Sequence, residues 1–150
     1  MSRYSATFLF MILGAALLGS TSCTSEAATS PAPPSAVAGQ VALTGSKQAA
    51  DLTIALFSAT NPPVRGANVL ETVITDGQGQ PVTDAQVAFD LDMTNMSHGK
   101  NIIVAAPQGN GRYAGQVFFM MPGPWRVIAL VQRPGQPVTQ TRFDFQVKLR

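Results

Sequence analysis

The chain ends with Arg142-Phe143-Asp144-Phe145-Gln146-Val147-Lys148-Leu149-Arg150, in which polar and apolar side chains alternate strictly. In an extended strand, the apolar residues of such a stretch point to one side and the polar residues to the other. This period of two is typical of an antiparallel β-strand with one buried face and one exposed face. The stretch Gln86–Asp92 repeats the pattern, with Val87, Phe89 and Leu91 on its apolar side. The alternation therefore predicts β-structure.

Seven short strands are predicted in the second two thirds of the chain, and turn residues bound each of them. The predicted strands are 51–58, 67–75, 85–92, 101–105, 112–119, 125–132 and 139–149. Clusters rich in Gly, Pro, Asn or Asp separate them, at 61–63, 76–79, 107–111 and 133–137. Seven strands in about 100 residues favour an antiparallel, immunoglobulin-like β-sandwich. We expect this domain to span residues 49–150, without the paired cysteines of antibody domains.

The first 22 residues have the layout of a secretory signal. Arg3 supplies a positive start, the run Phe8–Leu18 is apolar, and small residues follow it. A membrane-spanning helix needs roughly 20 apolar residues, so this run is too short to cross a bilayer. Residues 1–22 are therefore predicted to be a signal peptide, and the protein is predicted to be exported.

Cys23 directly follows this signal and is the only cysteine, so the chain cannot form an internal disulfide. Its position after an apolar run resembles the lipid-modification site of bacterial lipoproteins, and Ser22 is suitably small. Lipoproteins prefer Leu where this chain has Ser20. We expect a lipid anchor on Cys23. The alternative is cleavage after Ala27 or Ala28, which would release a soluble exported protein.

Residues 23–48 are predicted to be a flexible tether. They consist mainly of small residues and Pro, so they cannot bury enough surface to offset the entropy cost of ordering. Such a tether would hold the domain away from a membrane.

The formal net charge of the whole chain is only +2, and its Lys and Arg residues form no run. This distribution excludes nucleic acid as an expected partner.

The only histidine lies in the stretch Asp92–Lys100, which also contains two of the six methionines. If each predicted strand crosses the sandwich once, the connection after the third strand and the connection after the fifth lie at the same pole. The second connection begins with two further methionines. The strand count thus brings five candidate metal ligands into one neighbourhood: Met93, Met96, His98, Met120 and Met121.

Thioether sulfur is a soft ligand that suits Cu(I), and imidazole suits copper in either oxidation state. The set is poor for zinc, which prefers Cys, His and carboxylates. Asp90 and Asp92 are possible oxygen ligands, although their place on the polar face of a strand indicates solvation. Core packing stays open as an alternative, because Met fills irregular cores and Met93 continues the apolar alternation. His98 could equally be a solvated loop histidine.

Enzymatic chemistry is not expected. A single histidine, with no serine marked as its partner, gives no basis for a catalytic triad. Gly77-x-Gly79 follows a predicted strand but opens no helix, so it indicates a turn and not a phosphate-binding loop. The chain also has no pair of cysteines for redox chemistry.

Several motifs occur in a recognisable order. They are Gly66-Ala67-Asn68, Asp76-Gly77, Pro81–Val87, Met93-x-x-Met96-x-His98-Gly99, Gly111-Arg112-Tyr113 and Phe119–Val127. In this order the chain resembles the YtkA-like domain family, which is related to FixH, over roughly residues 50–149. The resemblance implies an immunoglobulin-like sandwich in an exported or membrane-tethered bacterial protein without a defined enzymatic activity. It also implies copper handling and cytochrome oxidase assembly, with Met93, Met96 and His98 as the family's Met/His segment and Met120 or Met121 as its later methionine.

Two functional hypotheses follow. In the first, a lipid-anchored sandwich binds copper through the five Met and His residues named above and exchanges it with another envelope protein. In the second, the domain binds an envelope partner through its sheet edge or loops, and the methionines provide packing or contact surface. Both place the protein in the periplasm or on the outer face of a bacterial membrane. Convergence of the donor atoms to within about 4–5 Å of one point would favour copper.

Overall fold

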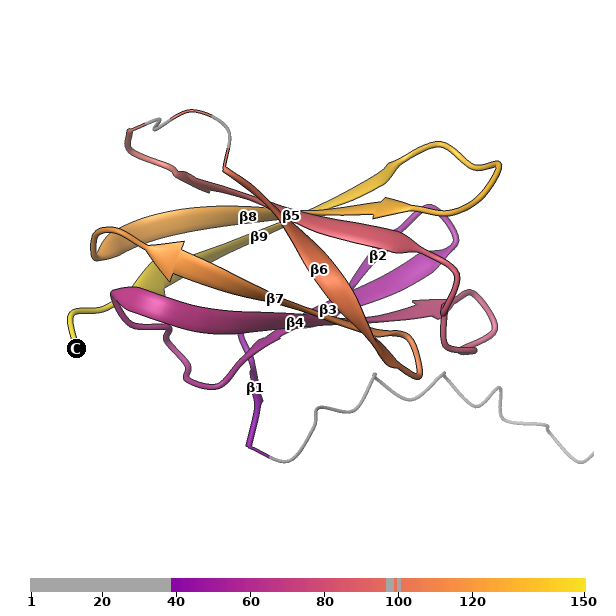
Figure 1. The fold of residues 1–150 in the computed structure, drawn as a ribbon, viewed down its shortest axis with the longest axis horizontal. Coiled ribbons are helices and arrows are strands. Elements are labelled where there is room, and N and C mark those ends of the chain that lie inside the picture. The colour runs from indigo at the N-terminus through magenta and orange to yellow at the C-terminus, as the bar shows by residue number, and fades with distance from the viewer. Residues whose placement is uncertain (1–38, 97–98, 100) are drawn as a thin grey trace, which may run out of the picture.

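The structure, a computed structural model, describes residues 39–96, 99 and 101–150. Within this part of the chain there are nine β-strands and no helix, hence no helix able to cross a membrane (Figure 1). The strands are β1 (Val41–Ala42), β2 (Lys47–Ala49), β3 (Leu52–Ser58), β4 (Gly66–Asp76), β5 (Gln86–Met93), β6 (Ile102–Gly109), β7 (Arg112–Phe119), β8 (Gly123–Gln132) and β9 (Thr139–Val147). The all-β prediction is confirmed. The seven predicted strands correspond to β3–β9, and the bounds agree within two residues except at β6, which ends four residues later than expected.

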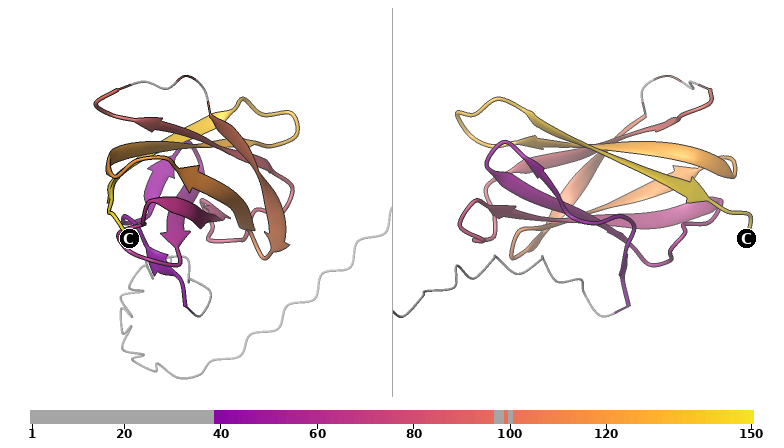
Figure 2. Two further views of the ribbon diagram at one scale, coloured as in Figure 1. Left: turned by 60° about the vertical axis from the view of Figure 1, so that its left-hand side comes forward. Right: turned by 180° about the vertical axis from the view of Figure 1, so that it is seen from behind.

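The strands form one curled antiparallel sheet in the order β1-β3-β4-β7-β6-β5-β8-β9, and β2 also pairs with β3. Strand β6 belongs to both halves of this sheet, since its first half pairs with β5 and its second half with β7. The two halves face each other as layers (Figure 2). The predicted pair of layers is therefore present, but β6 joins the layers into one hydrogen-bonded sheet.

The sheet begins before residue 49, the expected start of the domain: β1 lies within the stretch 23–48, β2 begins within it and ends at Ala49, and both pair with β3. Leu43 explains the difference. Its side chain is only 8% exposed within the core, and its amide donates a hydrogen bond of 2.9 Å to the Leu56 carbonyl. One buried apolar residue in a polar stretch is enough to hold this segment against the sheet edge.

The two ends of the curled sheet come together along a seam. Lys47 of β2 donates a hydrogen bond of 2.6 Å from Nζ to the Arg142 carbonyl of β9. Further along, the Lys148 amide donates to the Pro63 carbonyl at 2.9 Å, and the Arg65 amide donates to the Lys148 carbonyl at 2.8 Å. These contacts cover much of the otherwise open edge of β9, which would be a hazard for pairing with other chains.

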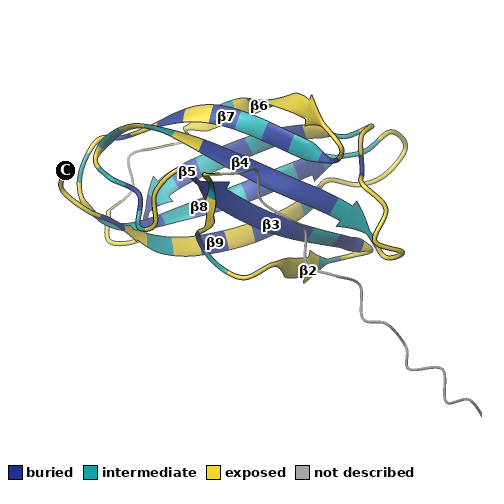
Figure 3. Ribbon diagram, turned by 90° about the horizontal axis from the view of Figure 1, so that it is seen from below, coloured by how far each residue is buried: buried dark blue, intermediate teal, exposed yellow. Residues whose placement is uncertain are grey.

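The core lies between the layers and is built from the inward-facing residues of each strand (Figure 3). Its largest fully buried side chains include Tyr113, Phe89, Phe119, Phe143, Leu52 and Ile54. The alternation of the last strand is confirmed up to Val147, which is 3% exposed. Leu149 differs from the prediction and is 66% exposed, because β9 ends at Val147.

Tyr113 joins the core to the β4–β5 connection. Its hydroxyl donates to the Val82 carbonyl at 2.9 Å and accepts from the Ala85 amide at 3.2 Å. The side chain is almost fully buried, and this burial raises the pKa of its phenol above the ordinary value of 10.0. Such a tyrosine, hydrogen-bonded to an upstream backbone segment, is also found at the strand corners of immunoglobulin-like sandwiches.

Candidate functional site

The two methionine-bearing connections lie at one end of the sheet, as the strand count predicts (Figures 1 and 2). Met93 at the end of β5 is the register partner of Trp125 in β8. One residue further on, the Thr94 amide donates to the Pro124 carbonyl at 3.1 Å. We call this end of the sheet, with Met93, Met96, Met120 and Met121, the Met pole.

The four methionines of the Met pole differ in accessibility. Met93 is 4% exposed, and its Cε would lie 3.1 Å from a Cβ added at Gly123, so it packs in the core against that glycine. Met121 is half-buried and packs against the core. Met96 and Met120 are 46% and 58% exposed. Of the predicted ligands, Met96 and Met120 thus present the accessible sulfurs, while His98 lies outside the described residues.

Hydrogen bonds hold the backbone of the second connection. The Trp125 indole donates to the Met121 carbonyl at 3.0 Å, and Arg65 Nε donates to the Met120 carbonyl at 3.2 Å. Trp125 is 3% exposed and packs edge-on against Phe119 with a ring-centroid distance of 5.0 Å. Trp125 therefore packs over one end of the core. The connection with Met120 and Met121 is therefore held by these hydrogen bonds next to the packed rings of Trp125 and Phe119.

Residues 46–130 match the family model described as YtkA-like. The chain belongs to the YtkA-like family. No curated protein matches its sequence.

Two solved structures are similar to this YtkA-like chain. A DUF4426 family protein from Pseudomonas aeruginosa PAO1 has a TM-score of 0.52 at 14% identity, over 71% of this chain and 99% of that chain. The soluble domain of PmoD from Methylocystis sp. ATCC 49242 has a TM-score of 0.49 at 12% identity, over 68% of this chain and 95% of that chain. The first likeness supports the β-rich fold alone.

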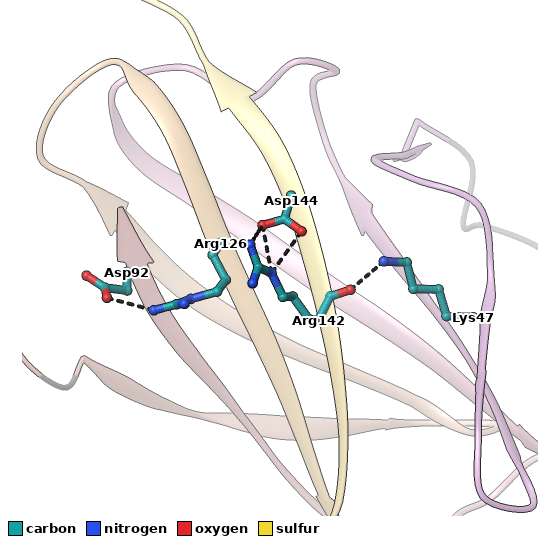
Figure 4. A network of polar contacts seen from close by, with 5 residues as sticks. All are labelled: Lys47, Asp92, Arg126, Arg142 and Asp144. Carbon is teal, nitrogen blue, oxygen red and sulfur yellow. Dashed lines mark hydrogen bonds and ion pairs between the residues drawn. The ribbon is translucent and has the colours of Figure 1, made fainter. Parts of the chain in front are cut away.

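The carboxylates near the Met pole of this YtkA-like domain are held in ion pairs (Figure 4). Asp92 accepts a hydrogen bond of 2.8 Å from Arg126, which is its register partner on β8. Arg126 in turn is the register partner of Asp144 on β9. Two-point hydrogen bonding from Arg142 lowers the pKa of the Asp144 carboxyl and raises the pKa of the Arg142 guanidinium. The carboxylates of Asp92 and Asp144 are thus both engaged by arginines of neighbouring positions.

No group of three or more His, Cys, Asp and Glu side chains able to hold a metal occurs in the part of the chain that the structure describes. Asp90 lies on the outer face, where its register partners on the two neighbouring strands are Ile102 and Ile128. A metal site at the Met pole of the YtkA-like domain would therefore depend on thioethers and imidazole.

Two shallow hollows lie on the outer face of β4 and β7, and no methionine lines either of them. The first, of about 290 Å³, is lined by Ala59, Thr60, Val64, Ala67, Asn68, Val69, Gln116 and Arg150. The second, of about 430 Å³, is lined by Gln40, Val69, Glu71, Gln108, Arg112 and Ala114, and contains the ion pair between Glu71 and Arg112.

The contact of Arg65 with Met120, at the Met pole of this YtkA-like domain, could not be predicted from the sequence. The contact joins residues 55 positions apart and depends on the pairing of Gly66 with Phe119 between β4 and β7. Those strands are not consecutive, so their register cannot be read from the spacing of apolar residues. The Gly66-Ala67-Asn68 motif was the nearest available signal.

Proposed function

We propose that this chain is an exported protein that binds copper at the Met pole and exchanges it with another protein of the cell envelope. The observation that supports this most strongly is the presence of two exposed methionines, 46% and 58% accessible, on neighbouring connections of a rigid sheet. Exposure leaves both side chains accessible to an ion from solvent, and thioether sulfur is a ligand suited to Cu(I).

Direct ligation is assigned to Met96, His98 and Met120. Soft, flexible thioethers bind copper and allow rapid exchange of ligands, which suits transfer of the ion more than permanent storage. The buried Met93 and half-buried Met121 support the connections from the core side. Copper is the cargo of this protein. The sheet fixes the position of the connections, and the flexible thioether side chains on them are the ligands.

Copper titration of residues 24–150, which lack the proposed lipid-anchor site Cys23, tests this assignment. Replacing both Met96 with Leu and His98 with Ala should weaken Cu(I) binding, measured against a competing chelator, by at least about tenfold, since even loss of outer-shell partners costs a metal site this much. Met93→Leu is the matched control, because it removes a thioether from the core and should leave the affinity unchanged. Equal affinities of the double variant and the wild type would eliminate the site.

The same proposal includes export by the signal peptide 1–22, a lipid anchor on Cys23, and a chain without enzymatic activity. The three-part signal and the single cysteine support the anchor. Mass spectrometry of the mature N-terminus decides this point, because a diacylglyceryl group on Cys23 would demonstrate lipidation and a start at or beyond Thr24 would exclude it.

We also propose that the curled sheet is a variant of the immunoglobulin-like sandwich, which the facing layers and the Tyr113 contact support.

A second candidate is an envelope-protein binding module without metal. Exposed apolar side chains on the outer surface favour it: Ile102, Val104 and Phe118 are 49%, 77% and 59% exposed. In that case the exposed methionines would be contact surface, and Cu(I) would bind neither the wild type nor the variants above with measurable affinity.

A further inference from the structure

Arg65 places positive charge beside one of the two exposed sulfurs of the Met pole. Its guanidinium Nε donates to the Met120 carbonyl at 3.2 Å. Along β4 and β7 the register runs to Gly66 opposite Phe119, which makes Arg65 and Met120 the next residues outward on the two strands. Opposed residues of neighbouring strands carry their side chains on the same face of the sheet. The hydrogen bond from Nε therefore holds the guanidinium charge beside the backbone of Met120.

Carboxylates do not compensate this charge. Among the described residues, Arg65 forms no ion pair with an acidic side chain. Asp92, the acidic residue next to Met93, is paired with Arg126. The Lys148 carbonyl accepts from the Arg65 amide at 2.8 Å, which holds the backbone of Arg65 in place. An ion bound at Met120 would therefore experience a net repulsion.

We propose that Arg65 makes the Met pole selective for a monovalent soft cation, Cu(I) or Ag(I), over divalent cations. This inference rests on the proposed function and adds charge selection to it. Thioether ligands favour soft metal ions, but they do not by themselves exclude a soft divalent ion such as Cd(II). Coulomb repulsion by a fixed guanidinium is twice as large for a divalent ion as for a monovalent ion at the same position. Arg65 is thus a specificity-determining residue and not a ligand.

Ag(I) and Cd(II) form a suitable pair of probes because both are soft and redox-inert but differ in charge. Their dissociation constants would be measured by calorimetry on residues 24–150, without the lipid-anchor site, for wild type, Arg65→Gln and Arg65→Lys. Removing the charge with Arg65→Gln should shift the ratio of the two constants toward Cd(II) by about three- to tenfold. Arg65→Lys should keep the wild-type ratio, and added salt should reduce the selectivity of the wild type.

Arg133→Gln is the matched control. This arginine follows β8 at the opposite end, where it contacts Asp84 and Asp51, about 30 Å along the strand from the Met pole. Its removal should leave the ratio unchanged. An unchanged ratio in Arg65→Gln, with Ag(I) still bound, would overturn the selectivity and leave the copper proposal intact. Equal shifts in Arg65→Gln and Arg65→Lys would also overturn it, because hydrogen bonding to Met120 would then be the cause. Failure of wild type to bind Ag(I) would instead remove the proposed function itself.

Discussion

Replacing Phe119 with alanine should lower the free energy of unfolding by about 3–5 kcal/mol, the usual cost of deleting a fully buried phenylalanine. Phe119 is 0% exposed and contacts two other aromatic rings, Trp125 at 5.0 Å and Phe145 at 5.8 Å between centroids. The loss would remove a large share of the stability of a typical domain. Urea denaturation followed by far-UV circular dichroism measures it.

The neighbouring Phe118 provides the matched control for this experiment. The two residues have the same side chain and the same strand, but Phe118 points outward and is 59% exposed. Phe118→Ala should therefore change the stability by less than about 1 kcal/mol. Similar losses for both variants would contradict the assignment of the inner face of β7, and with it the position of Met120.

Replacing Gly111 with alanine should cost about 2–4 kcal/mol, because two separate penalties act at this position. Asn110 and Gly111 form the β6–β7 turn with φ angles of 50° and 71°, which suits the Asn-Gly pair of a tight hairpin. A Cβ at Gly111 would also lie 2.5 Å from the Ile74 carbonyl oxygen and 3.1 Å from Pro81 Cβ. Backbone on the neighbouring strand would have to move.

Gly135 separates the two penalties. Its φ is 70°, close to that of Gly111, but an added Cβ would meet nothing within 4 Å. Gly135→Ala should cost only the conformational penalty of about 1 kcal/mol. The midpoints of thermal unfolding of the two variants would compare them directly. If the two substitutions destabilise equally, the close approach of the β6–β7 turn to β4 is wrong.

Local patterns in the sequence were sufficient to predict the strands of the main sheet. Alternation of apolar residues and clusters of Gly, Pro and Asn depend on neighbours along the chain, so β3–β9 could be located before the structure. The edge strands β1 and β2 could not, because their five residues are mostly exposed, show no regular alternation and pair only with β3. The sharing of β6 between layers depends on long-range pairing and has no local signature.

The candidate site was predictable in outline only. Counting strands was enough to bring the connections around Met93 and Met120 to one pole. The alternation of the third predicted strand left burial of Met93 open as an alternative, but the choice could not be made from the sequence; Met93 is 4% exposed and Met96, three positions on, is 46% exposed. The packing of Met93 against Gly123 causes this difference, and it requires the β5–β8 register. The contact of Arg65 with Met120 likewise depends on the register between β4 and β7.

The seam between β2 and β9 has a consequence for biogenesis. Lys47 and Arg142, which are joined across it, lie 95 positions apart, and β9 is the last strand of the chain. During synthesis or passage through an export channel, the N-terminal strands emerge long before their closing partner does. Formation of the complete sheet is therefore a late event, which must wait until β9 has been synthesised.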